Sequence, residues 1–259
     1  MVKIDVVILC GGRGSRLSLK TADTPKPLVE IGQYPILYHI MKIFDKYKFK
    51  KFYLTLGYKG NDIKKWFMND YPYISSMTVD FKEPLMFIGQ DKWVVNFIDT
   101  GLNSGTGYRL KQLKNYIDDR FILTYGDGLA DIDLNKLIEF HKKMVVKKGV
   151  VATVSANKPR SQFGIIKSEE GLVTEFVEKP ILDDWTSIGF FVCEPQFFNY
   201  LNNNKDSMFE VDVLPKLVKE KKIAVYQHDG WFRPMDDMKD YDVLNEMWKS
   251  GKAPWVKNK

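Results

Sequence analysis

The feature that most constrains this chain is a glycine-rich loop directly after its first apolar run. Residues 6–10, Val-Val-Ile-Leu-Cys, are apolar without a break, and Gly11, Gly12 and Gly14 follow them. Such a run is typical of a strand buried on both faces, as in a parallel sheet covered by helices. Glycines after it let the backbone take positive φ and point its N–H groups at one anion. We therefore expect an α/β fold with a phosphate-binding loop near its N-terminus.

Two basic residues after this loop strengthen the prediction of a phosphate site. Arg16 offers a planar guanidinium, and Lys26 stands between two prolines that restrict the backbone. The alternative is a plain glycine turn with two solvated cations, which we regard as the weaker interpretation. The spacing matches neither G-x-G-x-x-G, whose last glycine is replaced by Leu17, nor G-x-x-x-x-G-K-[ST]. Dinucleotide-binding and P-loop interpretations are therefore excluded.

The composition favours an enzyme that acts on anionic small molecules. A formal net charge of +6 is spread along the 259 residues and forms no arginine-rich helix, so we expect no nucleic-acid partner. No apolar stretch is long enough to cross a membrane, and Lys3 and Asp5 interrupt the first run where a signal peptide would stand. Cys10 and Cys193 are expected to be small core residues. We expect a cytoplasmic protein with no membrane partner.

The order of apolar patterns predicts one α/β domain over residues 1–259. Helical and strand patterns alternate at 36–47, 52–56, 121–125, 134–144 and 150–154. From residue 158 shorter strands follow at 163–167, 172–178 and 188–193, which we expect to extend the sheet. We predict a nucleotide-binding core in 1–157 and an acceptor-binding and C-terminal part in 158–259.

An aspartate directly follows the second buried strand. Gly126-Asp127-Gly128 comes after residues 121–125, and ligands gather at the carboxyl ends of strands in open parallel sheets. We favour Asp127 as a Mg²⁺ ligand over a simple turn former. Asp131 and Asp133 are expected to begin the next helix, and Asp236 brings a second acid into an aromatic segment.

A glycine-spaced loop at residues 101–107 precedes a predicted helix at 108–116. A loop of this kind can wrap a nucleotide base, or it can be a long surface turn. We favour contact with the base.

Several motifs of this chain resemble those of sugar-phosphate nucleotidyltransferases, which make an NDP-sugar from an NTP and a sugar 1-phosphate. The first is Leu-Cys-Gly-Gly-Arg-Gly-Ser-Arg-Leu at 9–17 with Pro-Lys-Pro-Leu-Val-Glu-Ile-Gly at 25–32. Later segments, over essentially the whole chain, are similar to glucose-1-phosphate cytidylyltransferases: Gly57-Tyr58-Lys59-Gly60, Asp99-Thr100-Gly101, Arg109-Leu110-Lys111, Thr124-Tyr125-Gly126-Asp127-Gly128, Glu178-Lys179-Pro180, Met235-Asp236 and Gly251-Lys252-Ala253-Pro254-Trp255.

This resemblance implies a Rossmann-like, mostly parallel sheet flanked by helices and a cytidylyltransferase of nucleotide-sugar, capsule or lipopolysaccharide biosynthesis. CMP would pass from CTP to a phosphorylated acceptor, with pyrophosphate released. The resemblance assigns Arg16 and Lys26 to the triphosphate, Lys179 to the acceptor phosphate, and Asp127 with Asp236 to Mg²⁺. The other substrate-binding positions that it implies are Leu9, Gly11, Gly12, Gly14, Ser15, Thr106, Gly107, Arg109, Tyr125, Gly126, Glu178, Ser187, Ile188 and Gly189.

One departure from the family pattern concerns the acceptor. Ser187-Ile188-Gly189 stands where the family typically has Asn-Gly-Gly. Isoleucine cannot pair with a substrate hydroxyl, so we expect CTP to remain the donor and glucose 1-phosphate to be a poor acceptor. Alternatives are a non-sugar phosphate such as phosphoglutamine, another NTP as donor, or a non-catalytic nucleotide-binding regulator. A homo-oligomer is compatible with the sequence.

Overall fold

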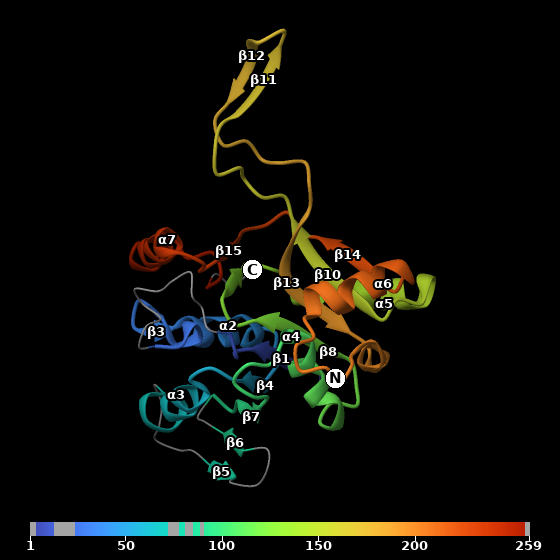
Figure 1. Ribbon diagram of the computed structural model, residues 1–259. Coiled ribbons are helices and arrows are strands. Elements are labelled where there is room, and N and C mark those ends of the chain that lie inside the picture. The colour runs from blue at the N-terminus through green and yellow to red at the C-terminus, as the bar shows by residue number, and fades with distance from the viewer. Residues whose placement is uncertain (1–3, 13–23, 72–77, 81–84, 89–90, 257–259) are drawn as a thin grey trace.

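The computed structural model describes residues 4–12, 24–71, 78–80, 85–88 and 91–256 (Figure 1). Its main feature is a 9-stranded sheet that takes strands from both the N-terminal and the C-terminal parts of the chain. In spatial order the strands are β14 (Ile223–Gln227), β10 (Ala152–Asn157), β13 (Thr186–Cys193), β8 (Phe121–Tyr125), β1 (Asp5–Leu9), β4 (Lys51–Leu56), β7 (Val94–Asp99), β6 (Leu85–Ile88) and β5 (Thr78–Asp80).

This sheet is mixed, with a parallel centre. Strand β1 pairs in parallel with β4 and β8, β4 with β7, and β10 with β14. Only β13 and β6, among the strands of this sheet that the structure describes, run against both of their neighbours. The predicted Rossmann-like, mostly parallel α/β fold is therefore confirmed.

Helices cover both faces of the sheet, as the apolar run of β1 requires. Val6 and Ile8 belong to one buried cluster, whereas Val7 and Leu9 belong to another on the opposite face. The first cluster takes residues from α2 (Ile36–Asp45), α3 (Gly60–Lys65), α5 (Leu134–Lys148) and α7 (Met238–Lys249). The second takes residues from α4 (Thr106–Lys111), η4 (Gln112–Asn115), η5 (Pro195–Tyr200), η6 (Phe209–Val213) and α6 (Leu214–Lys219).

Helix starts follow local capping chemistry where the sequence supplies it. Asp133 accepts hydrogen bonds from the backbone N–H groups of Asn135 and Lys136, both at 3.1 Å, and so begins α5. Helix α3 begins without a side-chain cap, at Gly60 directly after Lys59 at φ 51°. A π-helical turn, η3 (Trp66–Asp70), then continues α3.

The segment after β10 leaves the main sheet and forms an arm. Strands β11 (Ile165–Glu169) and β12 (Leu172–Val177) pair only with each other, and their hairpin projects from the body (Figure 1). All residues of both strands are exposed. The prediction that they extend the sheet is wrong for this hairpin, although β13 and β14 do join the sheet.

Two separate two-stranded sheets position residues of the candidate site. The first joins β9 (Gly128–Ala130) to β15 (Phe232–Pro234), and the second joins β2 (Glu30–Ile31) to β3 (Tyr34–Pro35) after the 3₁₀ turn η2 (Lys26–Leu28). Within the described part of the chain, no helix combines the length and the apolar character needed to span a bilayer.

Candidate active site

A cavity of about 640 Å³ opens where β1 and β8 end. This volume suits a small-molecule ligand, and its position matches the edge at which parallel sheets bind ligands. Strands β1 and β8 each lead into the cavity at their last residues. The lining residues are Leu9, Cys10, Gly11, Gly12, Lys26, Pro27, Leu102, Asn103, Ser104, Gly105, Thr106, Arg109, Tyr125, Gly126, Asp127, Met208 and Asp236.

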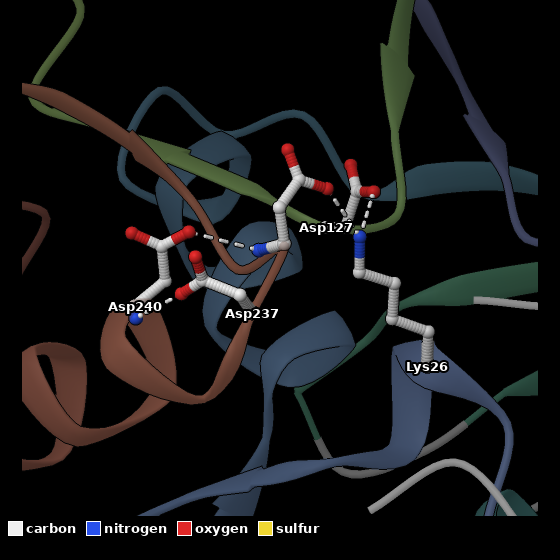
Figure 2. Close-up of polar contacts among 5 residues, drawn as sticks. Lys26, Asp127, Asp237 and Asp240 are labelled. Carbon is white, nitrogen blue, oxygen red and sulfur yellow. Dashed lines mark hydrogen bonds and ion pairs between the residues drawn. The ribbon is translucent and has the colours of Figure 1, made fainter. Parts of the chain in front are cut away.

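Lys26 joins the two predicted metal-binding acids in this cavity. Its Nζ lies 2.8 Å from Oδ2 of Asp127 and 2.8 Å from Oδ1 of Asp236 (Figure 2). The Lys26 side chain is 11% exposed, whereas those of Asp127 and Asp236 are 33% and 40% exposed. One face of each carboxylate is therefore open to the cavity while the other meets the ammonium group.

Local backbone structure brings these three side chains together. Pro25 precedes the 3₁₀ turn that begins with Lys26, and Pro27 follows within it. Asp127 lies between β8 and β9, and the N–H of Met235 donates to its carbonyl oxygen at 2.8 Å. Pairing of β9 with β15 thus fixes Asp236 beside Asp127, although more than a hundred residues separate them.

The environment of Lys26 keeps its ammonium group charged. Burial lowers the pKa of Lys26, but the charge of Asp127 and the hydrogen bonds to both aspartates outweigh burial, so the pKa is raised overall. A permanently charged ammonium at this position is suited to a phosphate chain.

Arg109 is a buried residue of the cavity lining that holds the surrounding loops together. It is 4% exposed and donates to the carbonyl oxygens of Gly11, Leu56, Gly101 and Leu102, and to Oγ1 of Thr100. These acceptors follow or end β1, β4 and β7, so one guanidinium ties three strand ends together. Burial lowers the pKa of Arg109, and the charge of Asp99 acts against that change. The predicted substrate-binding Arg109 is thus, in this structure, bonded to the protein's own loops.

The glycine at position 11 is required by close approach and not by positive φ. Gly11 and Gly12 are absent from the described glycines with positive φ, which corrects the sequence expectation. A Cβ on Gly11 would lie 2.3 Å from Nη1 of Arg109, and one on Gly57 would lie 2.4 Å from the same atom. The bare backbone at both positions makes room for the guanidinium.

The sequence analysis missed Glu210, an exposed carboxylate that bonds to two residues lining the cavity. Glu210 accepts from the hydroxyl of Tyr125 at 2.5 Å and from that of Thr106 at 2.7 Å. Burial, and then the charge of Glu210, raise the pKa of Tyr125. The glycine at 189, at φ 77°, lies against the Tyr125 ring, where a Cβ would come within 2.5 Å. Nothing in the motif pattern of η6 indicated this link.

Ten of the predicted site residues line the cavity. They are Leu9, Gly11, Gly12, Lys26, Thr106, Arg109, Tyr125, Gly126, Asp127 and Asp236. Gly14, Ser15 and Arg16 lie outside the described residues, so their expected roles stay predictions. Gly107 does not line the cavity; its N–H donates to the carbonyl of Ser207 at 2.9 Å. The loop singled out for base contact does reach the cavity, through residues 102–106.

The residues predicted for the acceptor lie elsewhere in the structure. Glu178 and Lys179 follow β12 at the base of the arm and pair with each other at 3.0 Å, with side chains 60% and 53% exposed. Ile188 is 2% exposed and belongs to the hydrophobic core, so it packs in the core rather than along the cavity. Ser187 accepts from the N–H of Gly189 at 3.4 Å. The argument for an altered acceptor therefore loses the side chain on which it rested.

The donor set fits a magnesium ion that is shared with phosphate oxygens. Mg²⁺ is commonly held by one or two carboxylates together with water and substrate phosphates. Asp127 and Asp236 meet at one ammonium group and both face the cavity. Within the described residues no group of three His, Cys, Asp or Glu forms a cage of protein ligands, so the substrate would have to supply further oxygens.

Comparisons with known proteins agree with this geometry. The model of the nucleotidyl transferase family matches residues 5–249. A Bacillus subtilis (strain 168) protein named "Probable glucose-1-phosphate cytidylyltransferase" is 43% identical over 253 residues, covering 96% of this chain and 98% of its own. Glucose-1-phosphate cytidylyltransferase of Salmonella typhi is 39% identical over 255 residues, covering 96% and 97%.

Solved structures share the fold. HddC from Yersinia pseudotuberculosis aligns with a TM-score of 0.67 at 24% identity, covering 95% of this chain and 99% of its own. A UDP-glucose pyrophosphorylase complexed with UDP-glucose aligns with a TM-score of 0.67 at 17% identity, covering 96% and 99%. The family match over most of the chain, the two sequence relatives and the carboxylate–lysine cluster at the strand ends all lead to one assignment: the chain belongs to the nucleotidyl transferase family.

Proposed function

We propose that this protein transfers CMP from CTP to a sugar 1-phosphate, with glucose 1-phosphate as the first candidate, and releases pyrophosphate. The observation that carries the proposal is the contact of Lys26 with both Asp127 and Asp236 inside the cavity. The names of the two sequence relatives support cytidylyl transfer to glucose 1-phosphate. Ile188 lies in the core, so no described side chain argues for a different acceptor.

The reaction brings together two polyanions, which repel each other, and the cavity offers positive charge that can offset this repulsion. An oxygen of the acceptor phosphate attacks the α-phosphorus of CTP, and the bond from that phosphorus to the β-phosphate oxygen breaks. The acceptor phosphate is already ionised near neutral pH, so no general base is needed. Lys26 supplies positive charge to the triphosphate, and the buried charge of Arg109 adds to the field at the strand ends.

Asp127 and Asp236 are the residues that would hold Mg²⁺. When bound, the ion would neutralise charge on the phosphates. The open faces of both carboxylates remain available while Lys26 holds the opposite side, so the protein presents these oxygens in a fixed position. Fixed charges cost no reorganisation during the reaction.

The loop at residues 102–106 is assigned to the base of the nucleotide. Asn103 and Ser104 line the cavity there. The hydroxyl of Ser104 donates to the carbonyl oxygen of Thr100 at 2.5 Å, so it meets a heterocycle as an acceptor, whereas the amide of Asn103 carries both donor and acceptor atoms. The Arg109 bonds to Gly101 and Leu102 hold the start of this loop. Lys179 is assigned to the acceptor phosphate, on the family resemblance and on its exposure.

We place the reaction in the cytoplasm, which suits two free, buried cysteines, Cys10 and Cys193. The proposal is tested by pyrophosphate release with each of the four NTPs and a panel of sugar 1-phosphates, with the CDP-sugar product identified by mass spectrometry. Turnover with CTP above the other NTPs is expected. Absence of turnover with every NTP would instead favour a non-catalytic nucleotide-binding protein.

A further inference from the structure

We propose that Asp240 is a positioning residue that holds Asp236 in place for the transfer proposed above, on which this inference rests. Oδ2 of Asp240 accepts the backbone N–H of Asp236 at 3.1 Å. Its other oxygen, Oδ1, accepts from Nη1 of Arg233 at 2.7 Å. One carboxylate therefore bonds to the side chain of Arg233, the middle residue of β15, and to the backbone of Asp236, the acid that contacts Lys26.

Asp240 is itself fixed by the start of α7. Its N–H donates to Oδ1 of Asp237, the N-cap residue of that helix, at 2.8 Å. In Figure 2, Asp237 and Asp240 lie together on one side of the view, and Lys26 and Asp127 lie together on the other. Asp236 links the two pairs, because its side chain bonds to Lys26 and its backbone N–H bonds to Asp240. The Asp240 side chain is 17% exposed, so its hydrogen bonds are sheltered from competition with water.

The far end of α7 is anchored to the segment that carries Lys26. Oδ1 of Asn245 accepts the N–H of Gly32 at 2.9 Å, and a Cβ on Gly32 would lie 2.1 Å from Nε1 of Trp248. Gly32 lies between β2 and β3, which directly follow the turn of Lys26. Helix α7 thus connects the backbone near Lys26 with the backbone of Asp236.

The position of Asp236 depends on a few backbone contacts. The Asp236 side chain is 40% exposed and is held mainly by its ion pair with Lys26. The direction in which its carboxylate points therefore depends on how the backbone of Asp236 is held. The N–H of Met235 is bonded to Asp127, and that of Asp236 is bonded to Asp240. Loss of the second bond frees the peptide group to rotate and lets the carboxylate leave Lys26.

The test compares Asp240→Ala with Asp242→Ala, a change at an exposed acid of the same helix. In Asp240→Ala we expect kcat to fall by about 10- to 100-fold, the scale of a small misplacement at a reacting centre. KM for CTP should stay within about threefold, because Lys26 and Asp127 still meet the nucleotide. Asp242→Ala should resemble the wild type.

The double variant Asp240→Asn with Arg233→Gln keeps an acceptor for the Asp236 N–H without an ion pair, and should recover most of the lost kcat.

Two results would overturn the inference: wild-type kcat in a folded Asp240→Ala protein, or a double variant as slow as Asp240→Ala. If Asp240→Ala does not fold, Asp240→Leu replaces it, because leucine fills a similar volume and removes the acceptor of the Asp236 N–H; reduced kcat is expected, and unchanged kcat contradicts the proposal. Wild-type turnover in the same assay tests the proposed function separately. A crystal structure of Asp240→Ala tests positioning without turnover: the Asp236 carboxylate should have left Lys26, and an unmoved carboxylate contradicts the role.

Discussion

The ammonium nitrogen of Lys26 lies 2.8 Å from a carboxylate oxygen of Asp236, a residue 210 positions later in the chain. The same nitrogen contacts Asp127 at 2.8 Å. Like charges repel when two carboxylates share a site, and a shared cation offsets that repulsion. The site is therefore assembled from three segments that are distant in the sequence, and the positive charge of Lys26 stabilises the two negative charges of Asp127 and Asp236 beside it.

The charge of Asp127 should be needed for turnover and not for folding. In Asp127→Asn, kcat should fall by at least about 10²-fold, because the missing charge acts mainly in the transition state. Circular dichroism should match the wild type, and thermal unfolding should stay cooperative with a lower midpoint, because Lys26 loses one of its two charged partners. Asp119→Asn at an exposed acid serves as the control. Turnover of Asp127→Asn close to that of wild type would remove this residue from the chemistry.

Lys26 and Lys179 should act on different substrates. Lys26→Ala should raise KM for CTP, and Lys179→Ala should raise KM for the sugar 1-phosphate, because each change removes one compact charge from one polyanion. Lys167, 71% exposed on the same arm, gives the control Lys167→Ala. Steady-state kinetics in which both variants are impaired for the same substrate would refute this division.

The meeting of Lys26 and Asp127 in one cavity could largely be predicted from the sequence. Lys26 and Asp127 each adjoin a feature with a local signature, a Pro-Lys-Pro turn and the end of an apolar strand. The positions of the residues expected to bind the acceptor were harder to predict. The sequence of β11 and β12 indicates strands but does not indicate which strands they pair with. Both strands contain β-branched and other apolar residues that favour strands, yet they form a separate arm. Ile188 was assigned to a substrate by motif position, whereas burial places it in the core.

The roles of Arg109 and Glu210 show why other parts could not be predicted. Arg109 bonds to backbone carbonyls at three strand ends, and these acceptors carry no side-chain signal in the sequence. Glu210 meets Tyr125 from 85 residues away. Such contacts follow from tertiary packing, which a single sequence does not display.

A side chain at position 57 should destabilise the fold, because it would collide with the guanidinium of Arg109. Gly57→Ala places a Cβ 2.4 Å from Nη1 of Arg109, and overpacking of this kind costs about 1–3 kcal/mol. The free energy of unfolding from urea titration should fall accordingly. Gly12→Ala is the matched comparison, since a Cβ there meets nothing within 4 Å. Equal stability of the two variants would show that the guanidinium moves aside freely.

Folding stability should depend on pH through His39. This residue is 3% exposed; burial lowers its pKa from 6.5 to about 4, against the opposing effect of its hydrogen bond to Ile31. Between these values the unfolded chain binds a proton that the folded chain does not. Stability is therefore lost as pH falls from about 6.5 to about 4, by an amount on the order of 3 kcal/mol. Urea titrations of His39→Gln should show a shallower fall over this range, and a slope equal to that of wild type would contradict the assignment.

The most direct test of the account is pyrophosphate release by the wild-type protein with CTP, Mg²⁺ and glucose 1-phosphate, beside Asp127→Asn under the same conditions. We predict CDP-glucose formation with kcat/KM of about 10⁴ M⁻¹s⁻¹ or above for the wild type, a lower rate with UTP, GTP and ATP, and near-background turnover for Asp127→Asn. Absence of CDP-sugar from wild-type reactions, or equal turnover by the Asp127→Asn variant, would contradict cytidylyl transfer at the Lys26, Asp127 and Asp236 site.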